Sequence, residues 1–227
     1  MKRIDLTGIM RIYAHKQVLA VRKLQYKVVS ETGPRTKIIE QLERLAENLV
    51  SAFHNQNLAV AMIITNWHPT HIGKNPEEIM RSEFTAADAK LTIAREHGFS
   101  DWKDAANRAT ETFNMDFENS VDTLLSGDVG ALKAQVEENP GLLKERSKYG
   151  HKATLLHYAG SNGVETRRQI VPSNLPECVK LLIKNGADKN ATANLYGGEF
   201  TTLELASTSA HPKDAGILNK LLSELEN

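Results

Sequence analysis

Cysteine is nearly absent from this chain of 227 residues, which contains only Cys178. A single cysteine excludes an internal disulfide, a CxxC motif and a cysteine-rich zinc site. Its scarcity fits a reducing compartment, so we expect a cytoplasmic protein. No apolar run approaches the ~18 residues of a membrane span, and the opening MKRIDLTG lacks the apolar stretch of a signal peptide. We therefore expect no membrane span.

Net charge is also absent, because 28 Lys and Arg residues balance 28 Asp and Glu residues. This balance argues against binding nucleic acid through bulk charge. The charge is nevertheless uneven: residues 1–37 carry nine basic and two acidic residues, whereas residues 38–116 carry seven and twelve. The basic segment 1–37 therefore stands apart. Its apolar pattern does not distinguish helices from a short hairpin.

Motifs of catalysis are missing as well. The chain has no G-x-G-x-x-G, no P-loop and no G-x-S-x-G sequence. His68 and His71 could place two imidazoles together, but no further ligand follows at a regular spacing. We expect Cys178 to act as a small buried hydrophobe. The sequence therefore predicts no enzyme, no cofactor and no metal site.

Helical signals fill residues 38–116. Ile38, Leu42, Leu45 and Leu49 recur at steps of three and four, as on one face of a helix. Asn75-Pro76 and Thr85 are typical helix starts, and Gly98 is a typical helix end. No convincing strand occurs between residues 36 and 150. This region is predicted to be α-helical.

The C-terminal half carries a recognisable repeat motif. Residues 153–159, ATLLHYA, resemble the T-P-L-H-x-A opening of an ankyrin repeat, with Leu155 in place of proline. Residues 177–190, ECVKLLIKNGADKN, resemble the second helix and exit of such a repeat. Residues 201–206 resemble the next opening, and residues 216–223 its second helix.

Two weaker similarities lie upstream. Residues 48–69 align with residues 119–140 at a constant offset of 71, as two helical hairpins would. Residues 87–102 resemble a segment found ahead of the repeats in bacterial ankyrin-repeat proteins. The resemblance implies an all-α fold in which ankyrin-like repeats, residues 117–227, form a helical solenoid. Residues 38–116 would form its N-terminal cap, because one repeat cannot bury its own apolar face.

The resemblance also implies particular roles. In ankyrin repeats the histidine at the position of His157 hydrogen-bonds to the backbone between neighbouring repeats. We further expect Phe99 and Trp102 to face inward, against the unit that starts near Phe117. If they do, Trp102→Ala destabilises the whole chain.

The chain departs from the repeat pattern at two loops. Thr154 and Thr201 are 47 residues apart, whereas an ankyrin repeat has ~33 residues. The excess falls mainly in residues 164–173, and a glycine-containing finger, residues 195–200, precedes the last repeat. Insertions in solenoids often map to the binding face. A tolerated insertion that binds nothing is the alternative.

The resemblance implies a non-catalytic module that binds a partner protein through its finger loops and the 164–173 insertion. Aromatic and arginine side chains are typical of binding hot spots. The predicted contact residues are Tyr149, His151, Tyr158, Arg167, Arg168, Tyr196 and Phe200.

Two alternatives concern the basic segment 1–37. It could bind nucleic acid or another anionic surface through Lys16, Arg22, Lys23 and Lys27. It could instead pair with the acidic segment 38–116 within the fold.

Overall fold

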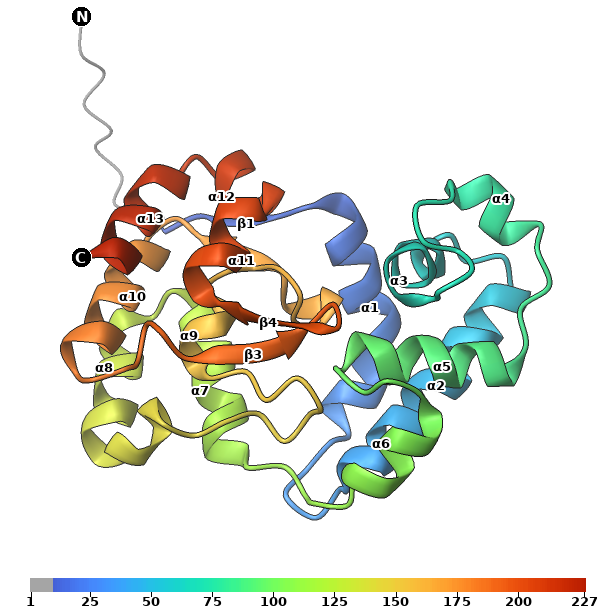
Figure 1. The fold of residues 1–227 in the computed structure, drawn as a ribbon, viewed down its shortest axis with the longest axis horizontal. Helices are drawn as coiled ribbons and strands as arrows, with labels where there is room; N and C mark the ends of the chain where they lie inside the picture. The colour runs from blue at the N-terminus through green and yellow to red at the C-terminus, as the bar shows by residue number, and fades with distance from the viewer. Residues whose placement is uncertain (1–9) are drawn as a thin grey trace, which may run out of the picture.

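The computed structural model describes residues 10–227 and is mainly helical (Figure 1). The regular elements within residues 38–116 are all helices, which turns and loops connect. One isolated bridge pairs Thr112 with Lys37, just before this region. These helices are α2 (Ile38–His54), α3 (Ala59–Trp67), α4 (Pro76–Met80), α5 (Ala86–Glu96) and α6 (Trp102–Arg108). The predicted helical region is confirmed.

The predicted helix boundaries of this region follow its capping residues. Asn75 accepts a hydrogen bond from the backbone N–H of Glu78 at 2.9 Å, and the Glu78 carboxylate accepts one from Asn75 N–H at 3.2 Å. Thr85 forms the same reciprocal capping box with Asp88. Gly98 ends the α5 turn with a φ of +79°, which glycine adopts without steric cost.

The described part of the basic segment forms a short strand and a helix. β1 (Ile12–Ala14) is followed by α1 (Lys16–Ser30). Helix α1 lies between the N-terminal helices and the C-terminal half, as Figure 1 shows. Its buried side chains serve both sides, because Val18 belongs to the C-terminal core whereas Val21 and Val28 belong to the N-terminal one.

The C-terminal half is built from helix pairs. Helices α7 (Met115–Ser126), α9 (Leu155–Tyr158) and α11 (Thr202–Thr208) contact one another in succession. Helices α8 (Val129–Glu138), α10 (Leu175–Lys184) and α13 (Leu218–Glu226) form a second contacting row. The shorter pieces are η1 (Pro140–Leu143), η2 (Thr166–Arg168) and α12 (Ala210–Asp214).

Four short strands qualify the all-α prediction. β1 pairs antiparallel with β2 (Ile170–Pro172), and β3 (Thr192–Leu195) pairs antiparallel with β4 (Gly198–Thr201). The β3–β4 hairpin occupies the predicted glycine-containing finger, and Tyr196-Gly197 form its turn. The β1–β2 pair joins the N-terminal segment to the insertion, a contact that no sequence pattern predicted.

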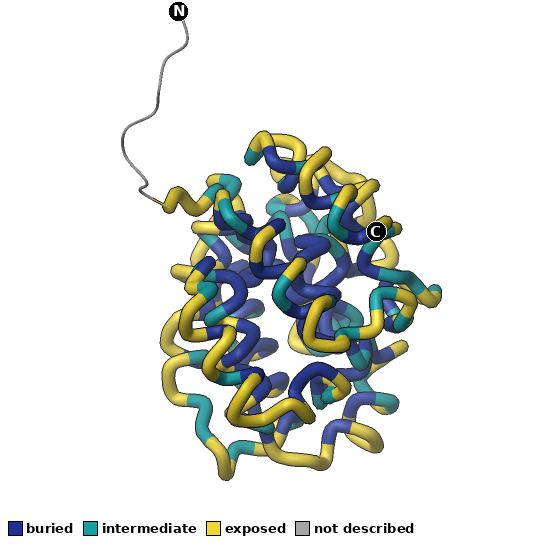
Figure 2. Tube along the Cα trace, turned by 90° about the vertical axis from the view of Figure 1, so that its left-hand side faces the viewer, coloured by how far each residue is buried: buried dark blue, intermediate teal, exposed yellow. Residues whose placement is uncertain are grey.

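Among residues 10–227 two hydrophobic cores form, one in each half. Figure 2 shows the buried residues in the interior and the exposed ones at the outside. Phe99 is buried in the N-terminal core, as expected. Trp102 is only partly buried against that same core, under the Lys90 ammonium, whereas Phe117 belongs to the C-terminal core. The expectation that Phe99 and Trp102 pack against the unit near Phe117 is therefore wrong, because both side chains join the N-terminal core and α6 packs back onto α5.

Candidate functional site

The 164–173 insertion lies inside the protein. Residues 164–172 are all buried, which corrects the expectation of a partner-binding surface loop. Contacts with the N-terminal segment cover the insertion. β1 pairs with β2, with Tyr13 opposite Val171, and the Arg22 guanidinium donates to the Arg167 carbonyl oxygen at 2.8 Å. The additional residues form an internal joint between the two halves.

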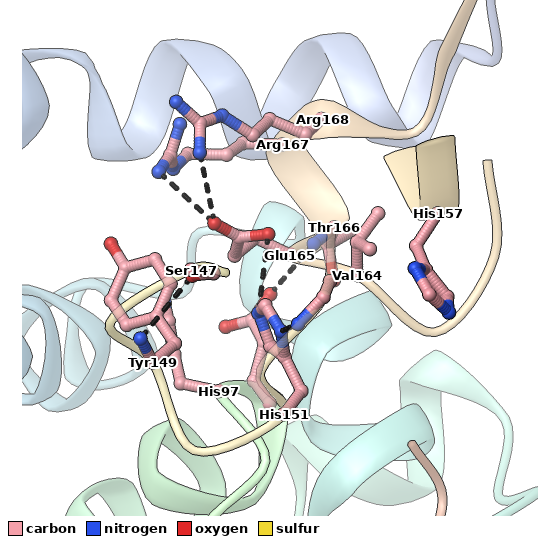
Figure 3. A network of polar contacts seen from close by, with 12 residues as sticks. His97, Ser147, Tyr149, His151, His157, Val164, Glu165, Thr166, Arg167 and Arg168 are labelled. Atoms are coloured by element: carbon pink, nitrogen blue, oxygen red, sulfur yellow. Dashed lines mark hydrogen bonds and ion pairs between the residues drawn. The ribbon is translucent and has the colours of Figure 1, made fainter. Parts of the chain in front are cut away.

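A buried ion-pair network occupies this joint (Figure 3). The Glu165 carboxylate is 1% exposed and accepts a hydrogen bond from Arg168 Nη1 at 3.2 Å. Its second oxygen lies 3.7 Å from His151 Nε2. Arg168 also pairs with Glu118 at 2.7 Å and with Asp122 at 3.2 Å. Paired charges of this kind avoid the large cost of burying an isolated one.

The network stabilises the charged forms of both Glu165 and Arg168. Burial alone would raise the pKa of Glu165, but the charges of Arg168 and Arg167 and the nearby His151 side chain hold that pKa well below its ordinary value. Burial alone would lower the pKa of Arg168, but Glu118 and Glu165 raise it well above its usual range. Glu165 and Arg168 therefore remain ionised inside the protein.

The end of α5 meets the same joint from the N-terminal half. Glu96 Oε1 accepts a hydrogen bond from the Thr166 backbone N–H at 3.0 Å, and burial raises the pKa of this carboxyl. His97 donates from Nδ1 to the Ile93 carbonyl oxygen at 2.8 Å, and burial lowers its pKa to about 4. Both side chains are therefore favoured in their neutral forms.

The first finger, residues 145–153, is held beneath the α5–α6 turn. The His151 backbone N–H donates to the His97 carbonyl oxygen at 3.2 Å. The Tyr149 hydroxyl donates to Gln41 Oε1 on α2. A Cβ on Gly98 would lie 2.2 Å from the His151 backbone nitrogen, so only glycine permits this close approach. The two halves are thus fitted together backbone to backbone.

Chemically, the network combines a carboxylate with two histidines, which is a set suited to acid–base chemistry. His97, His151 and Glu165 are each no more than 1% exposed, however, and a substrate has no open path to them unless the joint separates. Residues 10–227 contain no group of three or more His, Cys, Asp or Glu side chains able to hold a metal ion. The geometry is that of a structural clamp.

Five of the seven predicted partner-contact residues lie in this interior. Tyr149, His151, Tyr158, Arg167 and Arg168 are buried by the neighbouring elements and cannot contact a partner in this conformation. The sequence places Tyr149 and His151 on a finger, Tyr158 on the first helix of a repeat, and Arg167 and Arg168 on an insertion loop, but it does not show that neighbouring elements cover them. Only Tyr196, 53% exposed, and Phe200, half-buried, remain accessible.

Two other residues singled out in the sequence have clear positions. His157 donates from Nε2 to the Phe200 carbonyl oxygen at 3.2 Å, linking α9 to β4 as the repeat resemblance implies. Cys178 is buried in the C-terminal core, as predicted.

A cleft of 840 Å³ lies between the two halves, where the second finger, residues 192–200, faces α3 and α5. The Trp67 indole stacks on the Tyr196 ring, with 5.1 Å between the ring centroids and an angle of 5° between the ring planes. Arg95 also lines the cleft and donates from Nε to the Trp67 carbonyl oxygen at 3.1 Å. Asn162 and Asn194 add amide side chains from the C-terminal half. The sequence analysis missed Trp67 and Arg95, because they approach the finger only through tertiary packing.

Tyr196 is held in an unusual backbone conformation at the edge of this cleft. Its φ is +54°, although tyrosine has no intrinsic preference for left-handed geometry. The Tyr196 hydroxyl donates to Asn162 Oδ1 at 2.7 Å and accepts from the Gly163 backbone N–H at 3.1 Å. These contacts and the Trp67 stack fix the ring across the cleft. Strain retained in this way is a recurring property of binding sites.

The basic face of α1 remains open to solvent. Lys16, Lys23 and Lys27 are exposed, and none of them lies within 4.0 Å of a carboxylate among residues 10–227. Arg22 uses its guanidinium on the Arg167 carbonyl. The expectation that this face pairs with residues 38–116 is therefore not met by these side chains. The first nine residues of the segment lie outside the described residues.

Comparison of the chain with protein-family models, with curated proteins and with solved structures found no significant match. Over residues 10–227, no helix has the length and apolar character needed to cross a membrane.

Proposed function

We propose that this protein is a non-catalytic module that binds an extended segment of a partner protein in the cleft between its two halves. The observation that carries the proposal is the cleft of 840 Å³ beside the second finger, lined by aromatic, arginine and amide side chains. Tryptophan, tyrosine and arginine, which this lining contains, are enriched in protein-binding hot spots. The resemblance to ankyrin repeats supports the same class of function.

The chemistry of the cleft indicates what the segment would contain. Arg95 commits only Nε to an internal hydrogen bond, and it forms no ion pair among residues 10–227. Its terminal nitrogens suit a carboxylate on the partner. The stacked Trp67 and Tyr196 rings suit an apolar or aromatic side chain beside that carboxylate. The partner segment would therefore carry an acidic residue next to an apolar one.

The test is selection of peptides from a random phage-displayed library against the immobilised full-length chain. Arg95→Gln removes the cleft charge, and Arg81→Gln removes an exposed charge outside the cleft as the matched control. We expect enriched peptides that share an acidic–apolar pattern. Because a charge-assisted contact contributes ~1.5–3 kcal/mol, Arg95→Gln should weaken their binding at least about tenfold.

Thermal unfolding of both variants checks that the fold survives each change. Peptides that bind the two variants equally well, or a selection that enriches no peptide pattern, would contradict the proposal.

A second candidate function is binding to nucleic acid through α1, and it is favoured by the open basic face of Lys16, Lys23 and Lys27. Phosphate contacts release counterions, so affinity falls steeply with salt. Binding of single-stranded and double-stranded oligonucleotides at low salt and at ~200 mM salt tests it. A joint Lys23→Gln and Lys27→Gln variant should lose this binding. Unchanged binding by the variant would remove α1 as the interface.

A further inference from the structure

A second cavity, of 370 Å³, lies on the other side of the joint between α1 and the C-terminal half. Its apolar wall comes from Ile12, Val29, Leu125 and Ile170, which belong to four different segments. A volume of this order is in the range of small-molecule sites, which are mostly apolar with a few placed polar groups.

Two arginine residues line the same cavity. Arg22 reaches it from α1, and Arg167 reaches it from η2. Arg167 is 7% exposed, and its Nε is buried without a hydrogen-bond partner. A buried N–H of a charged group normally has a partner, so an unpaired one needs an explanation.

The neighbouring arginines differ in how many carboxylates pair with each of them. Arg168 takes part in close ion pairs with Glu118, Glu165 and Asp122. Arg167 forms a longer ion pair, with its Nη2 3.6 Å from Glu165 Oε1, and Arg22 has no carboxylate within 4.0 Å among residues 10–227.

Burial and the neighbouring charges of Arg167 and Arg168 lower the pKa of Arg22, although Asp122 opposes this effect. Asp122 also lines the cavity, but one of its oxygens already accepts from Arg168 Nη2 at 3.2 Å. A bound anion would relieve the repulsion between the two arginines.

We propose that this cavity binds a small organic carboxylate with an aliphatic body, whose carboxylate pairs with Arg22 and Arg167 and whose chain lies against the apolar wall. The site is separate from the cleft that lies beside the second finger. Because the ligand would touch α1, β2 and α7 together, its binding stabilises the joint between the halves.

The experiment is isothermal titration calorimetry of the full-length chain with octanoate. Octanol keeps the aliphatic body without the charge, octylamine reverses the charge, and inorganic phosphate keeps an anion without the body. We expect saturable binding of octanoate and at least about tenfold weaker binding of the other three, since a charge-assisted contact and the apolar burial each contribute more than ~1.4 kcal/mol.

Matched variants locate the site. Arg22→Gln should weaken octanoate binding at least about tenfold, whereas Lys23→Gln, one residue along the same helix and outside the cavity lining, should leave it unchanged. Ser126→Leu places a larger side chain at the cavity lining and should also abolish binding. If Arg22→Gln unfolds the chain, the Ser126→Leu variant still tests whether octanoate binds in this cavity. Circular dichroism confirms the fold of each variant.

Four results would overturn the proposal, and the first three are no binding of octanoate, equal binding of octanol, and equal losses in Arg22→Gln and Lys23→Gln. Phosphate bound as tightly as octanoate would show that the aliphatic body is irrelevant, and would overturn it too. Loss of octanoate binding leaves peptide binding in the cleft untouched, so the two proposals fail separately.

Discussion

The first finger, residues 145–153, and the second finger, residues 192–200, occupy equivalent places in the chain but different environments in the fold. Each leads into a short helix that begins after a threonine with a capping box. In the first box the partner side chain is His157, which is buried, and in the second it is Glu204, which is exposed. The first finger lies under the α5–α6 turn, whereas the tip of the second borders an open cleft.

This difference shows that a finger motif alone does not make a binding surface. The N-terminal half already occupies the first finger, through the contact of Gly98 with His151. What remains for a partner is the second finger and the space beside it. Four predictions separate the two environments, from the largest expected effect to the smallest.

The largest effect should come from the buried network behind the first finger. Glu165→Gln removes one charge and leaves Arg167 and Arg168 poorly compensated. Breaking a buried pair costs about 3–5 kcal/mol, a large share of the ~5–15 kcal/mol that stabilises a domain. Urea unfolding measures the loss of unfolding free energy in this variant. The control is Glu199→Gln in the exposed second finger, where we expect a change within about 0.5 kcal/mol. Equal effects of the two variants would show that the network is not stabilising.

Two glycines with the same backbone conformation offer a sharper comparison. Gly98 and Gly197 have φ values of +79° and +78°, but only Gly98 faces a close backbone neighbour. Alanine at Gly197 should cost about 1–2 kcal/mol from left-handed geometry alone. Alanine at Gly98 should cost about 1–3 kcal/mol more, because the two halves must separate to make room. Similar losses of unfolding free energy for the two substitutions would contradict the close fit at the first finger.

Acidification should destabilise the protein through two buried histidines. Burial lowers the pKa of His97 and of His157 to about 4, against an ordinary value of 6.5. Between pH 6.5 and about 4 the unfolded chain therefore binds more protons than the folded one, and stability falls as pH falls. Each histidine contributes a slope of up to about 1.4 kcal/mol per pH unit.

Unfolding free energies at several pH values measure this slope. His97→Gln tests the first finger, and His157→Gln tests the link to the second. Each substitution should reduce the slope of unfolding free energy against pH. If neither variant changes the slope, other titratable groups cause it.

The smallest effect concerns two tyrosine hydroxyls. Tyr149→Phe leaves the buried Gln41 side chain without its hydroxyl donor, which should cost about 1–3 kcal/mol. Tyr196→Phe removes a donor to Asn162 and the acceptor of the Gly163 backbone N–H, but Tyr196 is 53% exposed at the cleft, where water can replace its hydroxyl. The cost should therefore be smaller, about 0.5–1.5 kcal/mol. Urea unfolding compares the unfolding free energies of the two tyrosine variants. An equal cost would mean that the second finger is as firmly held as the first.

Local features of this protein could be predicted from its sequence. The capping residues Asn75 and Thr85 begin helices, Gly98 ends one, and the apolar spacing from Ile38 identifies the buried face of α2. The position of His157 between α9 and β4 followed from its motif. These features depend on residues close together in the chain, so a short window of sequence contains their physical cause.

The candidate site depended on contacts over long sequence distances. Tyr13 pairs across from Val171, Gly98 approaches His151, and Trp67 stacks on Tyr196. No local pattern in the chain encodes these meetings, because each results from burying the apolar faces of two separate halves against each other. The sequence by itself determined the helical character of the chain and the caps of its helices. Only the tertiary structure decided which finger is enclosed and which is open, because the N-terminal half covers one of them and excludes water from it.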